Sequence, residues 1–133
     1  MQLKKIKAKL EKKFPTKLAF DLDPIGISMG SEKKDVSKVL VSLDCSKRAV
    51  DMAVVNRCDA IITHHPFIYG PLEENMEDQL FKDLFDKINR NKIAVYSMHT
   101  NYDCAKGGMN DALINLFNPD KVSKLQDNML GRI

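Results

Sequence analysis

The chain alternates between short apolar runs and longer segments in which apolar residues recur at helical spacing. The short runs are typical of buried β-strands and occupy residues 38–43, 59–64 and 92–97. The amphipathic segments are typical of helices packed on a core and occupy residues 46–57, 77–90 and 109–117. This alternation predicts βαβ units with right-handed crossovers. The expected fold class is therefore α/β, with a mainly parallel sheet and helices on both faces.

The ends of the chain show different patterns. Residues 2–14 form a basic amphipathic pattern, which predicts a helix that ends before Pro15. Residues 19–30 contain a proline and two glycines among apolar residues, which indicates a looped or distorted extended segment. Residues 120–133 have no clear pattern. We expect residues 1–133 to form a single α/β domain, large enough to fold without a disulfide or a structural metal.

Composition argues against nucleic acid as a partner. The net charge is only +3, and the lysines are concentrated in the first predicted helix. Leu3, Ile6 and Leu10 share that helix at core-facing positions, so the lysines form a solvated face. Aromatic residues are not interleaved with these lysines, as they would be in a surface that stacks on bases.

The cysteines and the hydropathy pattern favour a cytoplasmic protein with no membrane partner. Cys45, Cys58 and Cys104 are odd in number and share no CxxC spacing, so neither a disulfide framework nor a zinc knuckle is supported. The amino terminus is too charged for a secretory signal. No apolar run approaches the roughly 20 residues that a membrane span requires.

Chemically versatile side chains follow each predicted strand. Asp44 follows the first strand, His64 and His65 end the second, and His99 and Asp103 come just after the third. The carboxyl ends of parallel strands lie along one edge of a sheet, where ligand sites gather. All three histidines of the chain are therefore expected to converge.

The residue types at this edge suit a transition metal. His64 and His65 precede Pro66, where the turning chain could direct the two rings at different metal ions. His99 and Asp103 are four residues apart, so one helical turn or a compact loop could bring both to one site. Imidazole combined with carboxylate suits zinc, manganese or iron. The alternative is an ordinary polar strand-to-helix turn, but the convergence of these residues favours metal binding.

Several neighbouring residues have two interpretations. Ser46 is a candidate N-cap of the helix predicted at residues 46–57, and Asp44 could cap the same helix or hold a metal ligand in place. Cys45 and Cys104 are expected to be small buried hydrophobes, although their position near the site would also suit redox sensitivity. Gly107 and Gly108 precede a helix and could bind a phosphate, but glycine pairs are usually turns.

Four ordered blocks resemble the GTP cyclohydrolase 1 type 2 homolog family over roughly residues 15–133. Three of them read KVLVSLDCSKRAVDMAV, IITHHPFIYGPL and IAVYSMHTNYDCAKGGMNDAL. The earlier segment DLDPIGISMG is similar to the family's Asp-Asn-x-Gly-Leu segment, with Asp23, Gly26 and Gly30 in register. Pro24 stands where the family usually has Asn.

The resemblance implies a dinuclear metal centre, to which His64, His65 and Asp103 contribute as ligands. In the family, a carboxy-terminal His-x-x-x-Glu motif completes the two-metal site, and the subunits assemble into toroidal homohexamers. This chain has no such motif and no histidine beyond His99. Its closing residues NMLGRI are similar to a segment from the middle of family members. We therefore expect the chain to match the amino-terminal half of a longer protein, as a fragment or a truncated product.

Two functions follow from this reading. The first is a metal-dependent hydrolase acting on a small, nucleotide-like molecule, with two divalent metal ions and with His99 as a proton shuttle or as a residue just outside the ligand set. The second is a non-enzymatic metal-binding protein, either a carrier or a regulatory interaction partner. A nucleic-acid binder that uses the basic first helix is the least favoured, because the overall charge is near neutral.

Overall fold

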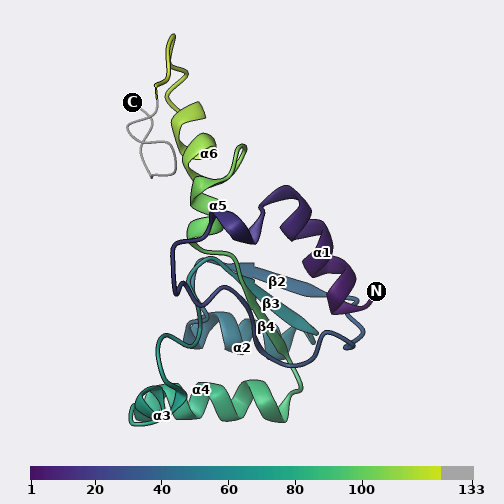
Figure 1. The fold of residues 1–133 in the computed structure, drawn as a ribbon. Coiled ribbons are helices and arrows are strands. Elements are labelled where there is room, and N and C mark those ends of the chain that lie inside the picture. The colour runs from purple at the N-terminus through teal and green to yellow at the C-terminus, as the bar shows by residue number, and fades with distance from the viewer. Residues whose placement is uncertain (124–133) are drawn as a thin grey trace.

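The computed structural model describes residues 1–123 and contains a four-stranded sheet in the order β1-β4-β3-β2 (Figure 1). Its strands are β1 Gly26–Met29, β2 Val39–Ser42, β3 Ala60–Thr63 and β4 Ala94–Ser97. Strands β2, β3 and β4 pair in parallel, and β1 pairs antiparallel with β4. The α/β class and the mainly parallel sheet predicted from the sequence are confirmed.

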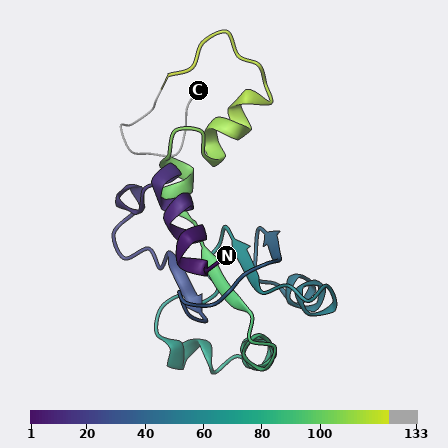
Figure 2. The same ribbon diagram turned by 90° about the vertical axis from the view of Figure 1, so that its right-hand side faces the viewer.

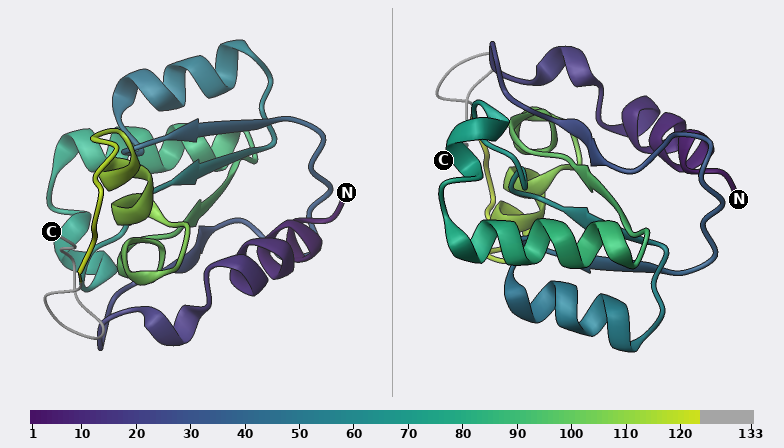
Figure 3. Two further views of the ribbon diagram at one scale, coloured as in Figure 1. Left: turned by 90° about the horizontal axis from the view of Figure 1, so that it is seen from above. Right: turned by 90° about the horizontal axis from the view of Figure 1, so that it is seen from below.

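The sheet is covered by helices on both faces. Figure 1 shows α1 on one side of the sheet and α2 and α4 on the other, and the two views of Figure 3 agree. The helices are α1 Leu3–Lys13, α2 Lys47–Val55, α3 Leu72–Asn75, α4 Gln79–Arg90, α5 Thr100–Cys104 and α6 Met109–Asn115, with a 3-10 turn at Thr16–Leu18. Helix α6 projects beyond the sheet, as Figure 2 shows.

Two buried clusters hold these layers together. Val50 and Ala53 of α2 pack with Ile88 of α4 against the sheet residues Ile61 and Val95. The opposite face carries the second cluster, composed of Leu3, Val36, Ala60 and Ala94 with Ile6, Ile27 and Val39 packed against it. Every residue of β3 and β4 is buried, as expected for central parallel strands with helices on both sides.

Local signals explain where the main helices begin. Ser46 caps α2 by accepting a hydrogen bond from the Ala49 N–H, as its position in the sequence predicts. Asp78 caps α4 in the same way by accepting a bond from the Phe81 N–H. Helices α2 and α4 are joined on their outer side by Asp51, whose carboxylate contacts both Lys47 and Lys87.

One corner of the sheet is open. Helix α1 reaches Val39 at the start of β2, but Val41 on the same face of that strand is 77% exposed. A cavity of about 340 Å³ lies there, lined mainly by apolar side chains that include Phe14, Val41, Leu43, Tyr102 and Met109. His64 also lines it. The open corner therefore adjoins the candidate site.

The segment at residues 19–30 is a loop followed by a distorted strand, as predicted. Its second half contains β1, which has a β-bulge between Ile27 and Met29. The closing residues 128–133, compared above with a mid-chain segment of the family, lie outside the described residues. Within residues 1–123, none of the helices is long and apolar enough to cross a membrane.

Candidate metal centre

His64 and His65 lie in a tight turn directly after β3. The backbone N–H groups of both residues donate to the Leu43 carbonyl at the end of β2. Thr63 Oγ1 donates to the His65 carbonyl at 2.8 Å and shares a second hydrogen bond with Ser97 Oγ. The turn is thus fixed from the ends of three neighbouring strands.

His99 and Asp103 are brought together by α5. His99 stands just before the helix, and its carbonyl accepts hydrogen bonds from the Tyr102 and Asp103 N–H groups. Asn101 is buried and bridges two segments: its Oδ1 accepts from the His99 N–H, and its Nδ2 donates to the Phe14 carbonyl. A short helix, and not a compact loop, therefore spans the interval between His99 and Asp103.

The three histidine rings share one hydrogen-bonding pattern. His64 Nδ1 lies 3.0 Å from the Met98 carbonyl oxygen, which can only accept, so this nitrogen donates. His65 Nδ1 lies 2.6 Å from an Asp44 carboxylate oxygen, and His99 Nδ1 lies 2.8 Å from an Asp23 carboxylate oxygen. Each ring therefore uses Nδ1 for an oxygen acceptor and leaves Nε2 as the nitrogen free to bind a ligand.

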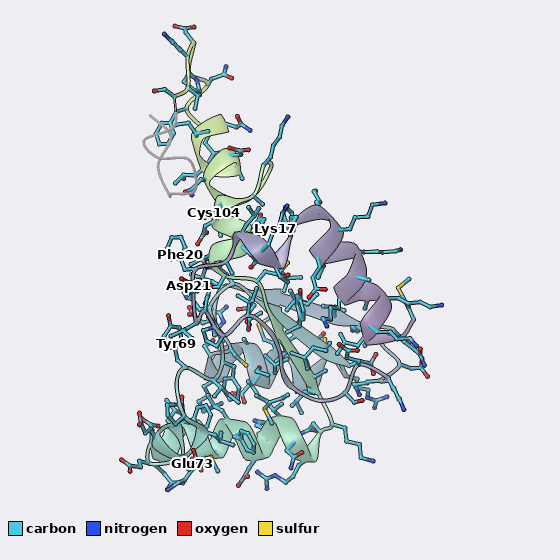
Figure 4. All side chains as sticks on the ribbon, viewed as in Figure 1. Lys17, Phe20, Asp21, Tyr69, Glu73 and Cys104 are labelled. Atoms are coloured by element: carbon cyan, nitrogen blue, oxygen red, sulfur yellow. The ribbon has the colours of Figure 1, made fainter. Side chains whose placement is uncertain are left out.

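The rings are close enough to act on one ligand. One candidate ligand atom from each of His64, His65 and His99 lies within 4.8 Å of the others. The Asp103 carboxylate adds a negative charge, because its Oδ1 lies 3.6 Å from His64 Nε2. The ring of the exposed Tyr69 lies edge-on to His99, with the ring centroids 6.4 Å apart. Figure 4 shows Tyr69 at the margin of the molecule that also carries Phe20 and Asp21.

Burial shifts the pKa values of two groups at this site, His64 and Asp103. It lowers the pKa of His64 below its usual value, and the neighbouring His65 and His99 act in the same direction. Burial also raises the pKa of Asp103. A neutral imidazole is the form that binds metal. Three imidazoles with one carboxylate form a donor set that fits zinc, manganese or iron and does not resemble an all-oxygen calcium or magnesium cage.

The chain was compared with known protein families. The model of the Duf34/NIF3 family (NGG1p interacting factor 3) matches residues 1–133. The chain belongs to the Duf34/NIF3 family. Curated relatives named GTP cyclohydrolase 1 type 2 homolog confirm the resemblance carried by the sequence blocks. The one from Methanocaldococcus jannaschii is 36% identical over 134 residues, which cover 100% of this chain and 54% of the relative. The one from Listeria innocua is 38% identical over 118 residues, which cover 89% of this chain and 32% of the relative.

Solved structures of Duf34/NIF3-like proteins have the same fold. The structure described as reduced HcgD from Methanocaldococcus jannaschii matches with a TM-score of 0.90 at 34% identity. The matched region covers 99% of this chain and 53% of the HcgD chain. A Bacillus cereus protein related to NIF3 gives a TM-score of 0.88 at 35% identity. The matched region covers 95% of this chain and 35% of the Bacillus cereus chain. The chain thus spans about a third to a half of the length of the curated relatives it matches.

The structure decides between the two interpretations given above for Asp44, for Cys45 and for the glycine pair at residues 107–108. Asp44 contacts His65 and does not cap α2, whose cap is Ser46. Cys45 is buried in the apolar core, and this burial raises the pKa of its thiol to about 12. The glycine pair lies in a turn, and both of its N–H groups already have partners: Gly107 donates to the Asp111 carboxylate and Gly108 donates to the Ala105 carbonyl.

Two features of the site were missed by reasoning from the sequence. The first is Asp23, which holds His99 but was noted only as one residue of a family-like segment. The second is the buried hydroxyl pair of Thr63 and Ser97, which supports the His65 carbonyl. A signal existed for the second feature, since both hydroxyls stand at the ends of otherwise apolar strands.

Proposed function

We propose that this chain contributes to a dinuclear metal centre of a metal-dependent hydrolase, with His64, His65 and Asp103 as ligands and His99 beside them. The observation that carries the proposal is the shared orientation of the three rings. Each ring has Nδ1 hydrogen-bonded to an oxygen, and one ring nitrogen from each of the three histidines lies within 4.8 Å of the others. Asp103 joins this cluster through Oδ1, which lies 3.6 Å from His64 Nε2. Histidines that bind metal are usually held in this way.

The number of donors bears on how complete the centre is. A structural zinc ion takes about four ligands, and two ions need more. Within residues 1–123, the clustered donors are the three histidines and Asp103. A dinuclear centre would therefore draw further ligands from outside the described residues, in keeping with a chain that spans only part of its relatives' length.

The hydrolase proposal assigns a role to each group. A divalent ion at this site would lower the pKa of a coordinated water and polarise the bond to be cleaved. His99 is held at Nδ1 by Asp23 and would exchange a proton through Nε2. The cavity of about 340 Å³ beside His64 has room for a small molecule, and its mainly apolar lining would suit an apolar part of that molecule.

Cobalt(II) titration followed by a hydrolysis assay tests this function. Cobalt bound through imidazole and carboxylate gives a visible absorption band, which reports binding directly. The loaded chain is then tested on GTP and on nitrophenyl phosphoesters, with a chelator-treated sample as control. Metal-dependent turnover that is lost in His64→Ala supports the hydrolase. Cobalt binding without turnover of either substrate class would refute it for these substrates.

A metal carrier is the second candidate, and the exposure of one ligand favours it. His65 and its partner Asp44 have side chains that are 46% and 57% exposed, so an ion held there is accessible to an acceptor. A carrier should pass its ion to an apo-acceptor within minutes, whereas a catalytic centre should keep it during turnover. Metal transfer to a fluorescent chelator, timed with and without substrate, separates the two. The toroidal hexamer, the cytoplasmic location and the single-domain organisation stay predictions.

A further inference from the structure

Asp23 is a buried carboxylate that reaches the site from a distant part of the sequence. It lies in the loop that precedes β1, and its side chain is only 3% exposed. One carboxylate oxygen, Oδ1, lies 2.8 Å from His99 Nδ1. The other, Oδ2, accepts hydrogen bonds from the Thr100 N–H at 3.0 Å and from the Thr100 hydroxyl. The carboxylate therefore holds the start of α5 and the His99 ring at the same time.

The hydrogen bonds around this carboxylate favour its ionised form, because Oδ2 already accepts from both the N–H and the hydroxyl of Thr100. In keeping with this, burial would raise the pKa of Asp23, but the hydrogen bonds from Thr100 and His99 together lower it. An ionised carboxylate only accepts hydrogen bonds, so the proton of this contact belongs to His99 Nδ1. A neutral imidazole has one N–H, and the lone pair therefore lies on His99 Nε2.

We propose that Asp23 is a positioning residue that acts through His99, fixing the ring in the tautomer whose unprotonated Nε2 is free for the site. The part of this inference that concerns proton transfer rests on the proposed function, whereas the part that concerns the tautomer does not. The Thr100 contacts make Asp23 more than a chance neighbour, because they fix its oxygens before His99 is considered. The Phe20 N–H also donates to Thr100 Oγ1 and so joins the loop before β1 to the same network.

Asp44 makes the corresponding contact with His65, but it is far more exposed than Asp23. Asp44 accepts from His65 Nδ1 in the same way, but its side chain is 57% exposed and competes with water for that contact. Asp23 is shielded and carries two further hydrogen bonds. The Asp23 contact should thus determine a single tautomer of His99, and the Asp44 contact should bias that of His65 more weakly.

Asp23→Asn is the decisive substitution because it reverses one hydrogen bond while keeping the shape. The Thr100 N–H needs an acceptor, so the amide oxygen of Asn will face Thr100 and the amide NH₂ will face His99. His99 Nδ1 must then accept, and its proton moves to Nε2. Imidazole ¹⁵N NMR of the metal-free chain at about pH 8, above the usual histidine pKa of about 6.5, distinguishes the two tautomers. The chain has only three histidines to assign.

The expected result is Nδ1–H for His99 in the wild type and Nε2–H in Asp23→Asn. Metal-dependent hydrolysis should then be about 100-fold slower or more in the variant, because His99 Nε2 could no longer accept a proton. Asp44→Asn serves as the matched control and should alter His65 while leaving the His99 tautomer unchanged. An Nε2–H tautomer of His99 in the wild type would overturn the proposal without any variant. So would an unchanged tautomer in a folded Asp23→Asn. If the tautomers behave as expected but the wild type binds no zinc, the metal centre fails and the positioning role stands.

Discussion

Thr63 and Ser97 offer a sharp test of how the histidine turn is supported. Both side chains are buried, at the carboxyl ends of β3 and β4. Thr63 Oγ1 lies 2.8 Å from the His65 carbonyl oxygen and 2.8 Å from Ser97 Oγ. Thr63→Val keeps the branched shape but removes both hydrogen bonds, so a change in stability reports the hydroxyl and not the packing.

The cost of Thr63→Val can be worked from these contacts. A hydrogen bond contributes about 1 kcal/mol net, and a buried acceptor that loses its partner costs about 1–3 kcal/mol. The His65 carbonyl would keep only a long contact of 3.5 Å with Ser97 Oγ. We expect the free energy of unfolding to fall by about 2 kcal/mol. With a urea m-value of about 2 kcal/mol/M, the unfolding midpoint would fall by about 1 M.

The assay is urea unfolding followed by circular dichroism, with Thr16→Val as the matched control. Thr16 is exposed in the turn after α1, so its substitution should change stability by less than about 0.5 kcal/mol. Ser97→Ala should cost less than Thr63→Val, because Thr63 can still donate to the His65 carbonyl. Equal midpoints for Thr63→Val and Thr16→Val, with unchanged m-values, would refute the reasoning.

Two further predictions concern the frame around the site. Gly30→Ala should destabilise the fold by about 2 kcal/mol or more, because Gly30 has φ +89° and an added Cβ would lie 2.8 Å from Ala94 Cβ. Gly26→Ala is the control and should cost less, because Gly26 has φ +104° but open space around its Cα. Equal losses of stability in thermal unfolding would contradict the predicted clash with Ala94. Asp59 accepts hydrogen bonds from the backbone N–H groups of residues 37–38, and these bonds lower its pKa in the folded state. The ionised carboxylate therefore stabilises the fold fully above the unfolded-state pKa of about 3.9. This stabilisation is lost as the pH falls through the lower folded-state pKa. Asp59→Asn should therefore show a smaller loss of stability between pH 5 and pH 2 than the wild type, and identical acid-unfolding curves would count against this assignment.

Much of the fold follows from local patterns. The short apolar runs predicted β2, β3 and β4, and Ser46 was correctly placed as the cap of α2. The convergence of the histidines could also be predicted, because parallel strands bring their carboxyl ends to one edge. These features depend on residues near in sequence or on a general rule of topology, so a single chain is enough to find them.

The missed features all depend on contacts between distant residues. Strand β1 pairs antiparallel with β4 and carries a bulge, and its irregular sequence does not indicate a partner. Asp23 and His99 are 76 positions apart, and neither side chain carries a local signal for the other. Asp44 was ambiguous for the same reason, since a carboxylate before a helix suits either capping or a contact with a distant ring.

The most direct test of the metal centre is elemental analysis of the purified chain after reconstitution with zinc, manganese or iron. The comparison variant changes His64, His65 and Asp103 to alanine. Glu73→Ala is the control, because Glu73 is an exposed residue of α3 (Figure 4) and does not belong to the histidine cluster. The account predicts bound transition metal in the wild type and in Glu73→Ala, and its loss in the triple variant when circular dichroism shows that the variant is folded. Metal retained by the folded triple variant, or absent from the reconstituted wild type, would contradict it.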